Sequence, residues 1–485
     1  MSRVLIIGCV AVYSVLLFAV TWFTSRKAGN AGFFIGNRAS RWYVVAYGMV
    51  GASLSGITFM SVPGWVGSTQ FSYLLFVAGN FAGYLVIAYV LMPMYYKLNL
   101  TSIYGYLEKR FGFWSYKTGA FFFIISRIIG ASFRMFLVIN VLQTFVFDSM
   151  GIPFIFTVSL FILLILLYTY EGGIKTIIWT DALQTTFMLL AVFISITLVL
   201  KGLHIPLAEG IRNVRASNYS QVIFTDWHDK RFFIKQFLSG AFICIAMTGL
   251  DQEMMQKNLS CRNIGEAKKN MFSFSIVMVS VNLLFLFLGA LLYLYSIEKG
   301  IQLPSKSDDL FPFLVLNHFG KLAGIVFVIG LISAAYPSAD GALTSLTTSA
   351  CIDFLGFQKR EDEPEKKKLR HKVHLFFAFI LLTVVVLFRS AHDTAIIGKL
   401  FTVAGYTYGP LLGLFAFGLI TKRNVNDKFV PFICLASPIL CYFVNEYSET
   451  LLNGYHFGFE LLVLNGLITF TGLALLKGPI GKTTA

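Results

Sequence analysis

The chain has 485 residues, of which 56% are hydrophobic and only 13% charged, and its mean hydropathy is +0.73. These values exclude a soluble globular protein and predict a membrane protein. The formal net charge of +15 does not indicate a nucleic-acid partner, because the basic residues fall in short loops between apolar runs. The six cysteines form no CxxC motif or cluster with histidine, so neither a zinc site nor a redox pair is predicted.

Apolar runs long enough to cross a bilayer as helices recur along the whole chain. We therefore expect an all-α membrane protein with thirteen transmembrane helices in one domain, 1–485. The expected spans are 3–24, 42–62, 73–94, 118–147, 152–170, 176–200, 232–255, 270–296, 321–350, 373–390, 396–420, 429–446 and 456–476. An odd number of spans places the two termini on opposite sides of the bilayer.

The distribution of lysine and arginine predicts the orientation. If the amino terminus lies outside, the cytoplasmic loops hold 25 basic residues and the opposite side holds about 11. We expect a multi-pass protein of the cell (inner) membrane with its amino terminus outside and its carboxyl terminus in the cytoplasm. The most charged stretch, 359–372, is interpreted as a solvated cytoplasmic loop.

The second expected span contains a polar stretch, GASLSGITFMSVPG, at 51–64. Glycine weakens a helix, serine and threonine compete for its hydrogen bonds, and proline removes a donor. A break inside lipid is tolerated only where the freed main-chain groups line a cavity, and there they can coordinate a cation. Close helix packing through small residues is the alternative for this stretch.

Few ionisable residues remain at depth once the loops are set aside. Each is a candidate for a transport pathway, because charge inside a bilayer is costly, and the alternative is an interhelical ion pair or a misplaced span edge. That alternative is preferred for two of them, Lys235 and Glu253, which lie near span ends. The set is Arg127, Arg134, Asp181, Lys235, Asp251, Glu253 and Asp340.

A later span, SAAYPSADGALTSLTTSA at 333–350, is rich in serine and threonine and carries Asp340. Hard cations such as sodium prefer oxygen ligands, so a helix face with Ser338, Asp340, Thr344 and Ser345 predicts a dehydrated cation site. Packing through small residues also explains the serines but does not explain the carboxylate.

Three stretches together carry a family resemblance. The pattern GG-x-K-x-x-x-WTD-x-x-Q in YEGGIKTIIWTDALQ (170–184) resembles the signature of the sodium/solute symporter family, whose bacterial members carry sugars, proline and sialic acid. SLSGITF (53–59) and TTSACIDF (347–354) are similar to segments of the same family. The resemblance extends over nearly the whole chain.

The resemblance implies a fold of two inverted five-helix repeats, with a broken first helix in each. The repeats would cover about 42–200 and 232–420, with one helix before them (3–24) and two after (429–476). The second break is expected near TGLDQ, 248–252, and Gly249 is consistent with it.

The resemblance also implies two sodium sites. The general site would use main-chain carbonyls of Gly51, Leu54 and Ala334 with hydroxyls at two consecutive positions, here Pro337 and Ser338. The proline departs from the family pattern, because it lacks one hydroxyl ligand.

A second sodium site, known in some members, would join Asp181 to the serine-rich helix, where Asp340 stands at a position usually held by a hydroxyl. We hypothesise that Asp181 and Asp340 form a second cation site or a proton-coupled site.

For the solute, the family implies a pocket beside the first break. Ser53, Ser55 and Thr58 would present hydroxyls to it, with Asn80 from the following helix and Asp251 from the second break. This serine/serine/threonine spacing is similar to that of the family's sialic acid transporters. The polar triad of its sugar transporters is replaced here by Thr58, Val77 and Phe401.

The sialic acid transporters also hold the solute's carboxylate with an arginine on the third helix of the first repeat. Arg127 and Arg134 lie seven residues apart and nearly on one helical face, and an arginine fork matches a carboxylate. The alternative is that one or both pair with Asp181, Asp251 or a lipid headgroup.

We therefore expect a sodium-coupled secondary active symporter that imports a small organic solute, with sialic acid or another sugar acid favoured. A symporter for a neutral sugar, polyol or amino acid is the main alternative, and an ion or solute channel is the alternative of another class. No enzyme is expected, because the sequence carries neither GxSxG nor HExxH. The expected partners are the solute, one or two sodium ions and the lipid bilayer, with no nucleic acid and no obligate protein partner.

Overall fold

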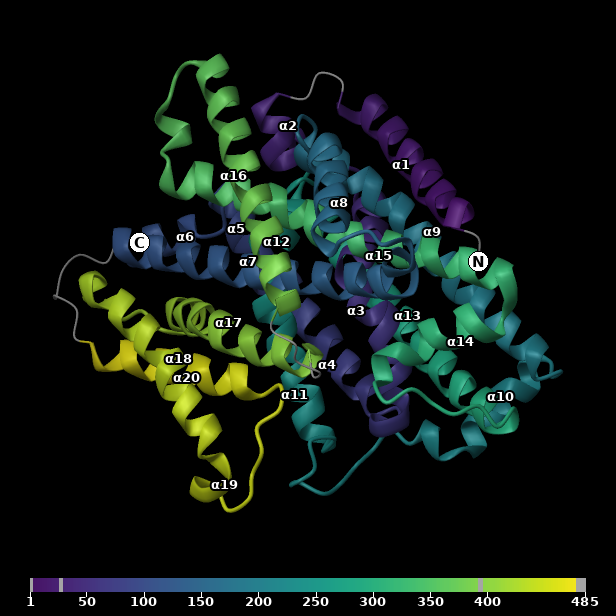
Figure 1. The fold of residues 1–485 in the computed structure, drawn as a ribbon. Coiled ribbons are helices and arrows are strands. Elements are labelled where there is room, and N and C mark those ends of the chain that lie inside the picture. Colours follow the sequence, from purple (N-terminus) through teal and green to yellow (C-terminus); the bar gives the residue numbers. More distant parts are fainter. Residues whose placement is uncertain (1–2, 26–28, 391–395, 477–485) are drawn as a thin grey trace.

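The computed structural model describes residues 3–25, 29–390 and 396–476. All regular elements within these ranges are helical (Figure 1). The main helices of the first half are α1 (Arg3–Ser25), α3 (Trp42–Thr69), α4 (Tyr73–Val86), α7 (Phe113–Leu142), α8 (Phe154–Thr169) and α9 (Gly173–Gly202). Those of the second half are α11 (Phe233–Cys244), α12 (Gln252–Leu259), α13 (Ile264–Glu298), α15 (Gly320–Ser349), α16 (Glu363–Ser390), α17 (Ile396–Ile420), α18 (Val430–Glu446) and α20 (Leu461–Leu475).

Shorter helices connect these elements at the ends of the bundle. They are α2 (Asn30–Ile35), α5 (Met92–Lys97), α6 (Gly105–Arg110), α10 (Leu207–Ala216), α14 (Leu310–His318) and α19 (Ser448–Leu451), with short 3-10 and π segments between them. Nine helices among the described residues are long and apolar enough to cross a membrane, and counting each of two bent pairs as one span gives up to eleven. The predicted all-α membrane fold is confirmed at this level.

Helix α3 is broken in its middle. Ser55 has φ +38° and ψ 170°, a backbone conformation that residues other than glycine rarely adopt. The two halves of α3 meet there at a bend of 57°. Pro63 lies in the second half without ending it. The break lies inside 51–64, where the polar composition predicted it.

The second broken span consists of α11, a π-helical turn at Ile245–Gly249, and α12. Its two parts meet at a bend of 66° on either side of Leu250 and Asp251. This is the position of the second break that the family resemblance implied.

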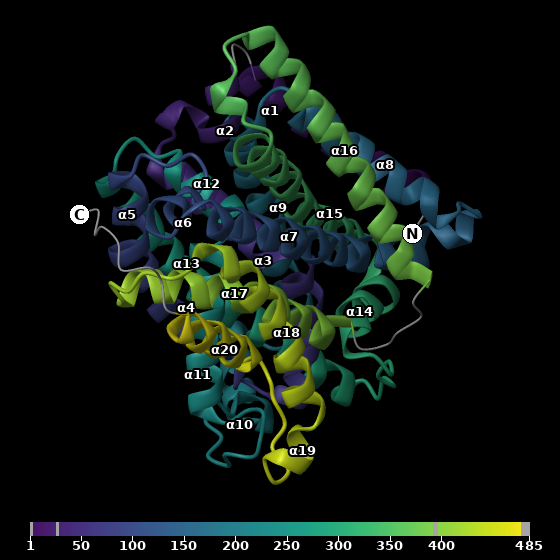
Figure 2. The same ribbon diagram turned by 90° about the vertical axis from the view of Figure 1, so that its left-hand side faces the viewer.

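The two broken spans lie inside the bundle and are covered by long unbroken helices. Helix α13 packs along α3, α11 packs along α4, and α15 packs along α9 and contacts both α3 and α7. Helices α17, α18 and α20 form a group at one side of the molecule, and α1 and α16 lie at its periphery (Figures 1 and 2).

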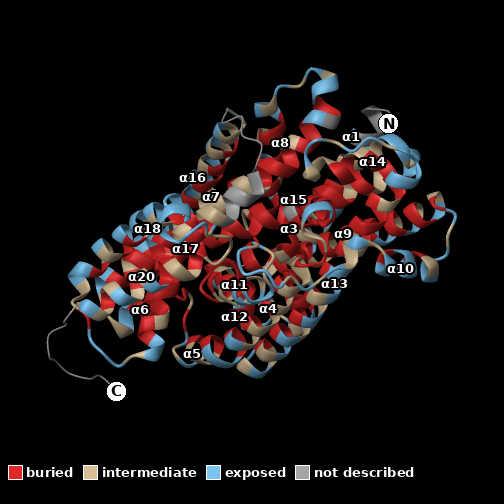
Figure 3. Cartoon of the chain, turned by 90° about the horizontal axis from the view of Figure 1, so that it is seen from below, coloured by how far each residue is buried: buried red, intermediate tan, exposed pale blue. Residues whose placement is uncertain are grey.

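Burial follows the same plan, with buried residues in the interior and exposed ones on the outer faces (Figure 3). The outer face of α18 exposes Phe432, Leu435, Ile439 and Phe443, as expected for a helix that contacts lipid tails. By contrast, α15 is buried without interruption from Leu331 to Ser349. The serine-rich helix is therefore an interior helix.

One loop expectation is wrong in part. The charged stretch 359–372 is not a loop throughout, because α16 begins at Glu363. Arg370 in its second turn is buried, stacks on Phe33 with its guanidinium carbon 4.5 Å from the ring centre, and pairs with Glu171 at 3.5 Å. Hydropathy did not predict this buried helical turn, because a hydropathy scale treats every arginine as a solvated charge.

Candidate functional site

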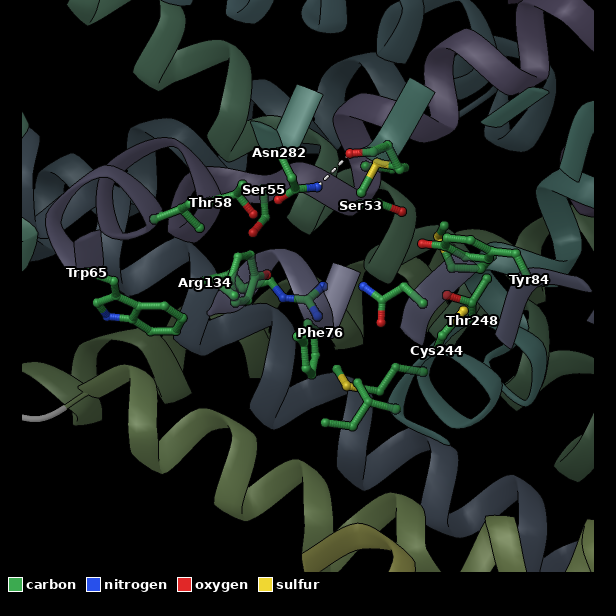
Figure 4. Close-up of a pocket in the computed structure, with 18 of the residues that line it drawn as sticks. Ser53, Ser55, Thr58, Trp65, Phe76, Tyr84, Arg134, Cys244, Thr248 and Asn282 are labelled. Atoms are coloured by element: carbon green, nitrogen blue, oxygen red, sulfur yellow. Dashed lines mark hydrogen bonds between the residues drawn. The ribbon is translucent and has the colours of Figure 1, made fainter. Parts of the chain in front are cut away.

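A cavity of about 130 Å³ lies beside the break in α3 (Figure 4). The first half of α3 contributes Ser53 and Ser55, and the second half contributes Thr58 and Trp65. The remaining walls come from other residues of α3 and from α4, α7, α11, the π turn before α12, α12 and α13. They are formed by Ala52, Val62, Tyr73, Phe76, Asn80, Tyr84, Arg127, Arg134, Ile243, Cys244, Met247, Thr248, Met254, Met278 and Asn282.

Arg134 brings an uncompensated positive charge to this cavity. Its side chain lies across the cavity from Ser55 (Figure 4), and no hydrogen bond or ion pair joins its guanidinium to any residue that the structure describes. Asn80 adds a buried side-chain oxygen, Oδ1, without a hydrogen-bond partner among the described residues. Asn80 Oδ1 is buried and unsatisfied within the described ranges, and Arg134 is only partly buried where it lines the cavity, so both groups are available to a polar solute.

Arg127 lies on nearly the same face of α7, seven residues before Arg134, but its guanidinium is paired with carboxylates. Its Nη1 is 3.4 Å from Asp251 Oδ2, its Nη2 pairs with Glu253, and its side chain is only 4% exposed. The interhelical ion pair weighed for Arg127 is therefore what the structure shows, and the same is true of Glu253. Of the two arginines predicted to bind solute, Arg134 is the one without an ion-pair partner in the part of the chain that the structure describes.

Asp251, predicted to contact solute from the second break, does not line the cavity and is fully buried. Its Oδ1 caps α12 by accepting the main-chain N–H groups of Glu253 at 2.9 Å and Met254 at 3.2 Å. Its Oδ2 accepts the Tyr408 hydroxyl at 2.7 Å. The structure therefore does not place Asp251 in the cavity, because its carboxylate caps the broken end of α12.

Several cavity residues were not predicted. Asn282 of α13 and Thr248 of the π turn add polar groups, and Phe76, Tyr84 and Trp65 supply aromatic surface. Asn282 donates to its own helix at Met278 O, 2.8 Å away, which leaves its side-chain oxygen for the cavity. A lone asparagine in the long apolar run of α13 was the only sequence signal for this residue.

The residues assigned to the general sodium site come from α3 and α15, which are in contact. A Cβ added to Gly56 at the break would lie 3.9 Å from the main-chain oxygen of Ala334. Ser338 is buried, and its Oγ has no hydrogen-bond partner in the described part of the chain. Gly51 and Leu54 precede the break by one turn or less, so their main-chain oxygens lie where the helical hydrogen bonds are interrupted.

Asp181 and Asp340, assigned to the second cation site, lie on the contacting helices α9 and α15, and both are fully buried. Asp340 Oδ2 accepts the Tyr168 hydroxyl at 2.7 Å. Asp181 Oδ2 is 2.7 Å from Nζ of Lys257, which is also 3.4 Å from Glu253 Oε1. Lys257 had been counted as a basic loop residue, and that assignment is wrong because it is fully buried in α12.

Outside the membrane-spanning segments, the loop before α14 packs on the second half of α3. A Cβ on Gly64 would lie 2.0 Å from the main-chain oxygen of Ser307, so the two backbones are in close contact. Burial in this contact raises the pKa of Asp308, and burial also raises the pKa of Asp309.

Two interrupted helices that meet at a polar cavity, with buried charges at the breaks, define a secondary transporter of the discontinuous-helix class. The model of the sodium:solute symporter family matches residues 33–428, which is most of the chain. The chain belongs to this family, and it is a sodium-coupled solute symporter.

Two curated relatives match over most of their length. The sodium/sialic acid symporter NanT of Aliivibrio fischeri is 23% identical over 435 residues, covering 88% of this chain and 85% of the relative. The sodium/sialic acid symporter SiaT of Proteus mirabilis is 24% identical over 424 residues, covering 84% and 83%. The fold is similar to that of a solved Na⁺-coupled sialic acid symporter, with a TM-score of 0.83 at 19% identity and 97% of each chain covered.

Proposed function

We propose that the chain imports a sugar acid of the sialic acid type together with sodium, and that Arg134 binds the solute's carboxylate. The observation that carries the proposal is the guanidinium of Arg134, which lies in the cavity without a carboxylate partner among the described residues. An unpaired cation inside a bilayer is costly, so a solute that brings an anion is favoured over a neutral one. Two relatives that carry sialic acid support the same solute.

The other polar groups of the cavity fit the rest of such a solute. Ser53, Ser55 and Thr58 offer hydroxyls that can donate to or accept from sugar hydroxyls, and Asn80 offers an unpaired oxygen. Tyr84 and Phe76 provide flat surfaces against the apolar face of a sugar ring. Asp251 has no direct part in this proposal, and Arg127 acts by holding α12 to α7.

For sodium we propose the general site between the α3 break and α15, with Gly51, Leu54, Ala334 and Ser338 as ligands. The Oγ of Ser338, which has no hydrogen-bond partner among the described residues, supports it. Pro337 lacks a hydroxyl, but it also lacks the N–H that would bond the main-chain oxygen of Ser333, four residues earlier in α15. That freed oxygen can replace the missing hydroxyl. Sodium bound here would hold the two helices together and shape the solute cavity.

We further propose the membrane arrangement expected from the sequence. The eleven long or bent spans, together with the shorter apolar helices α8 and α20, make thirteen. The pairing of α3 with α13 and of α4 with α11 is reciprocal between 42–200 and 232–420, as inverted repeats require. The amino terminus would lie outside and the carboxyl terminus in the cytoplasm, within one unit of 1–485.

In that orientation the solute cavity opens to the outside. It shares Trp65 and Tyr73 with a second cavity of about 330 Å³ that reaches the outer end of α3 and the loop before α20. On the cytoplasmic side α12 and residues 338–349 of α15 are buried throughout. The solute would enter past Trp65, and rocking of α3 and its partners against the surrounding helices would open the inner path.

The test is uptake of radiolabelled sialic acid by proteoliposomes under an inward sodium gradient. We expect concentration of the solute above the outside level, abolished when potassium replaces sodium. Concentration of a neutral sugar but not of sialic acid would contradict the proposed solute. Equilibration without concentration would indicate a channel, and chemical alteration of the solute would indicate an enzyme.

A further inference from the structure

Lys257 lies where the second cation site was expected. It comes from α12, the second part of the broken α11–α12 span, and it reaches Asp181 on α9 with an Nζ to Oδ2 distance of 2.7 Å. The contact has the length of a direct charge-assisted hydrogen bond, so the ammonium and the carboxylate touch each other.

Asp340 borders the same point from α15. A Cβ on its neighbour Gly341 would lie 2.4 Å from Glu253 Oε1, the atom that Lys257 also approaches at 3.4 Å. Asp340, the residue before Gly341, therefore lies at the same junction of helices. Helices α9, α12 and α15 therefore meet around one ammonium group.

The charges around this ammonium explain why it is there. Asp181, Glu253 and Asp340 are fully buried carboxylates, and Glu253 is shared with Arg127. Carboxylates left unpaired at this depth would cost several kcal/mol each by the usual desolvation penalty, so a cation is required beside them. Lys257, itself fully buried, supplies that cation from within the chain.

We propose that the Lys257 ammonium is a tethered cation that takes the place of a second sodium at Asp181 and Asp340. Together with the proposed general sodium site, on which this inference rests, it predicts that one sodium ion accompanies each solute. A sodium ion beside Asp181 would have to share the carboxylate with an ammonium already in contact with it, and two like charges at such a distance repel strongly in a low dielectric.

The tether also has a structural consequence. A co-transported sodium leaves its site in every cycle, whereas Lys257 stays attached to α12. The ammonium therefore keeps α12 joined to α9 and α15 whether or not sodium is present. Removal of the charge would leave Asp181 and Glu253 without this cation, and Asp181 Oδ1, which makes no hydrogen bond among the described residues, would be available as an oxygen ligand for sodium.

The decisive experiment titrates purified protein with sodium in the absence of solute, with choline as the replacing cation, and follows thermal unfolding. The rise of the unfolding temperature with sodium concentration should have a Hill coefficient of about 1 for wild type. For Lys257→Met it should be about 2. Lys257→Arg keeps the tethered charge and should remain near 1. Lys269→Met, which removes an exposed lysine from the next helix, is the matched control and should behave as wild type.

A second measurement keeps the test independent of whether Lys257→Met folds. The sodium-to-solute ratio of wild type should be one, measured in proteoliposomes held at zero membrane potential from the opposing sodium and sialic acid gradients at which the net sialic acid flux vanishes. A wild-type ratio or Hill coefficient of two would overturn the proposal, as would a folded Lys257→Met that still binds one sodium. If sialic acid is not the solute, uptake fails but the solute-free sodium titration is unaffected, so the two failures are distinguishable.

Discussion

Arg127 and Arg134 lie seven residues apart on α7, yet within the described residues only Arg127 is held by carboxylates, those of Asp251 and Glu253. The two arginines therefore do different work. Arg127 joins α7 to α12 across the second break, and Arg134 offers its charge to the solute cavity. Substitutions at the two positions should have separable effects.

Arg134→Gln should weaken binding of sialic acid by about 100-fold or more, because a desolvated charge pair of this kind contributes roughly 3 kcal/mol. Arg134→Lys keeps the charge but loses the fork, and we expect an intermediate loss of about 10-fold. Thermal unfolding should change little in either variant. Unchanged affinity in Arg134→Gln, measured by calorimetry in saturating sodium, would show that the carboxylate binds elsewhere.

Arg127→Gln should instead destabilise the protein. It leaves Asp251 and Glu253 buried with reduced compensation, and breaking a buried ion pair in this way costs roughly 3–5 kcal/mol. We expect a clear fall in the unfolding temperature in detergent, with Arg134→Gln as the matched control from the same helix. An Arg127→Gln protein as stable as the control would mean that the ion pairs do not form in the folded protein.

The position of the first break could be predicted from composition, but the partners of the buried charges could not. Glycine, serine and proline at 51–64 are local signals, and they act through the local backbone. Arg127 and Arg134 look alike on a helical wheel. Their ion pairing differs because α12, which is distant in sequence, approaches Arg127. Lys257 was missed because α12 has only eight residues and a polar composition, so hydropathy places it in a loop.

Ser55 gives a direct test of the break itself. Ser55→Gly and Ser55→Ala remove the same hydroxyl, but only glycine adopts φ +38° with ψ 170° without strain. Ser55→Gly should therefore be more stable than Ser55→Ala by roughly 1–3 kcal/mol. At Ser53, which has helical geometry, the order should reverse, because glycine is the weaker helix former. The same order at both positions in thermal unfolding would argue against an interrupted α3.

Ser338→Ala tests the general sodium site. Loss of one neutral oxygen ligand should lower the apparent sodium affinity by about 10-fold, on the order of 1 kcal/mol, without changing the fold. Ser345→Ala is the matched control on the same helix, because the Ser345 hydroxyl already donates to Ala342 O at 3.0 Å. Sodium dependence of solute uptake would be the measurement, and equal sodium affinities in the two variants would remove Ser338 from the site.

Asp308 predicts a pH dependence at the outer end of α3. Burial raises its pKa above the usual value of 3.8, so the folded protein binds this proton more tightly than the unfolded chain does. By linkage, the stabilisation is fully present below the unfolded pKa and is lost as the pH rises through the folded pKa. Asp308→Asn, which resembles the protonated carboxyl, should unfold at a higher temperature than wild type at pH 7.

The difference between Asp308→Asn and wild type should shrink as the pH falls towards 4, since the wild-type carboxyl then becomes protonated as well. Glu361→Gln, at an exposed position, is the control and should give no such pH-dependent difference. A stabilisation of Asp308→Asn that is constant from pH 8 to pH 4 would assign the effect to the amide's own hydrogen bonds and not to burial of the charge.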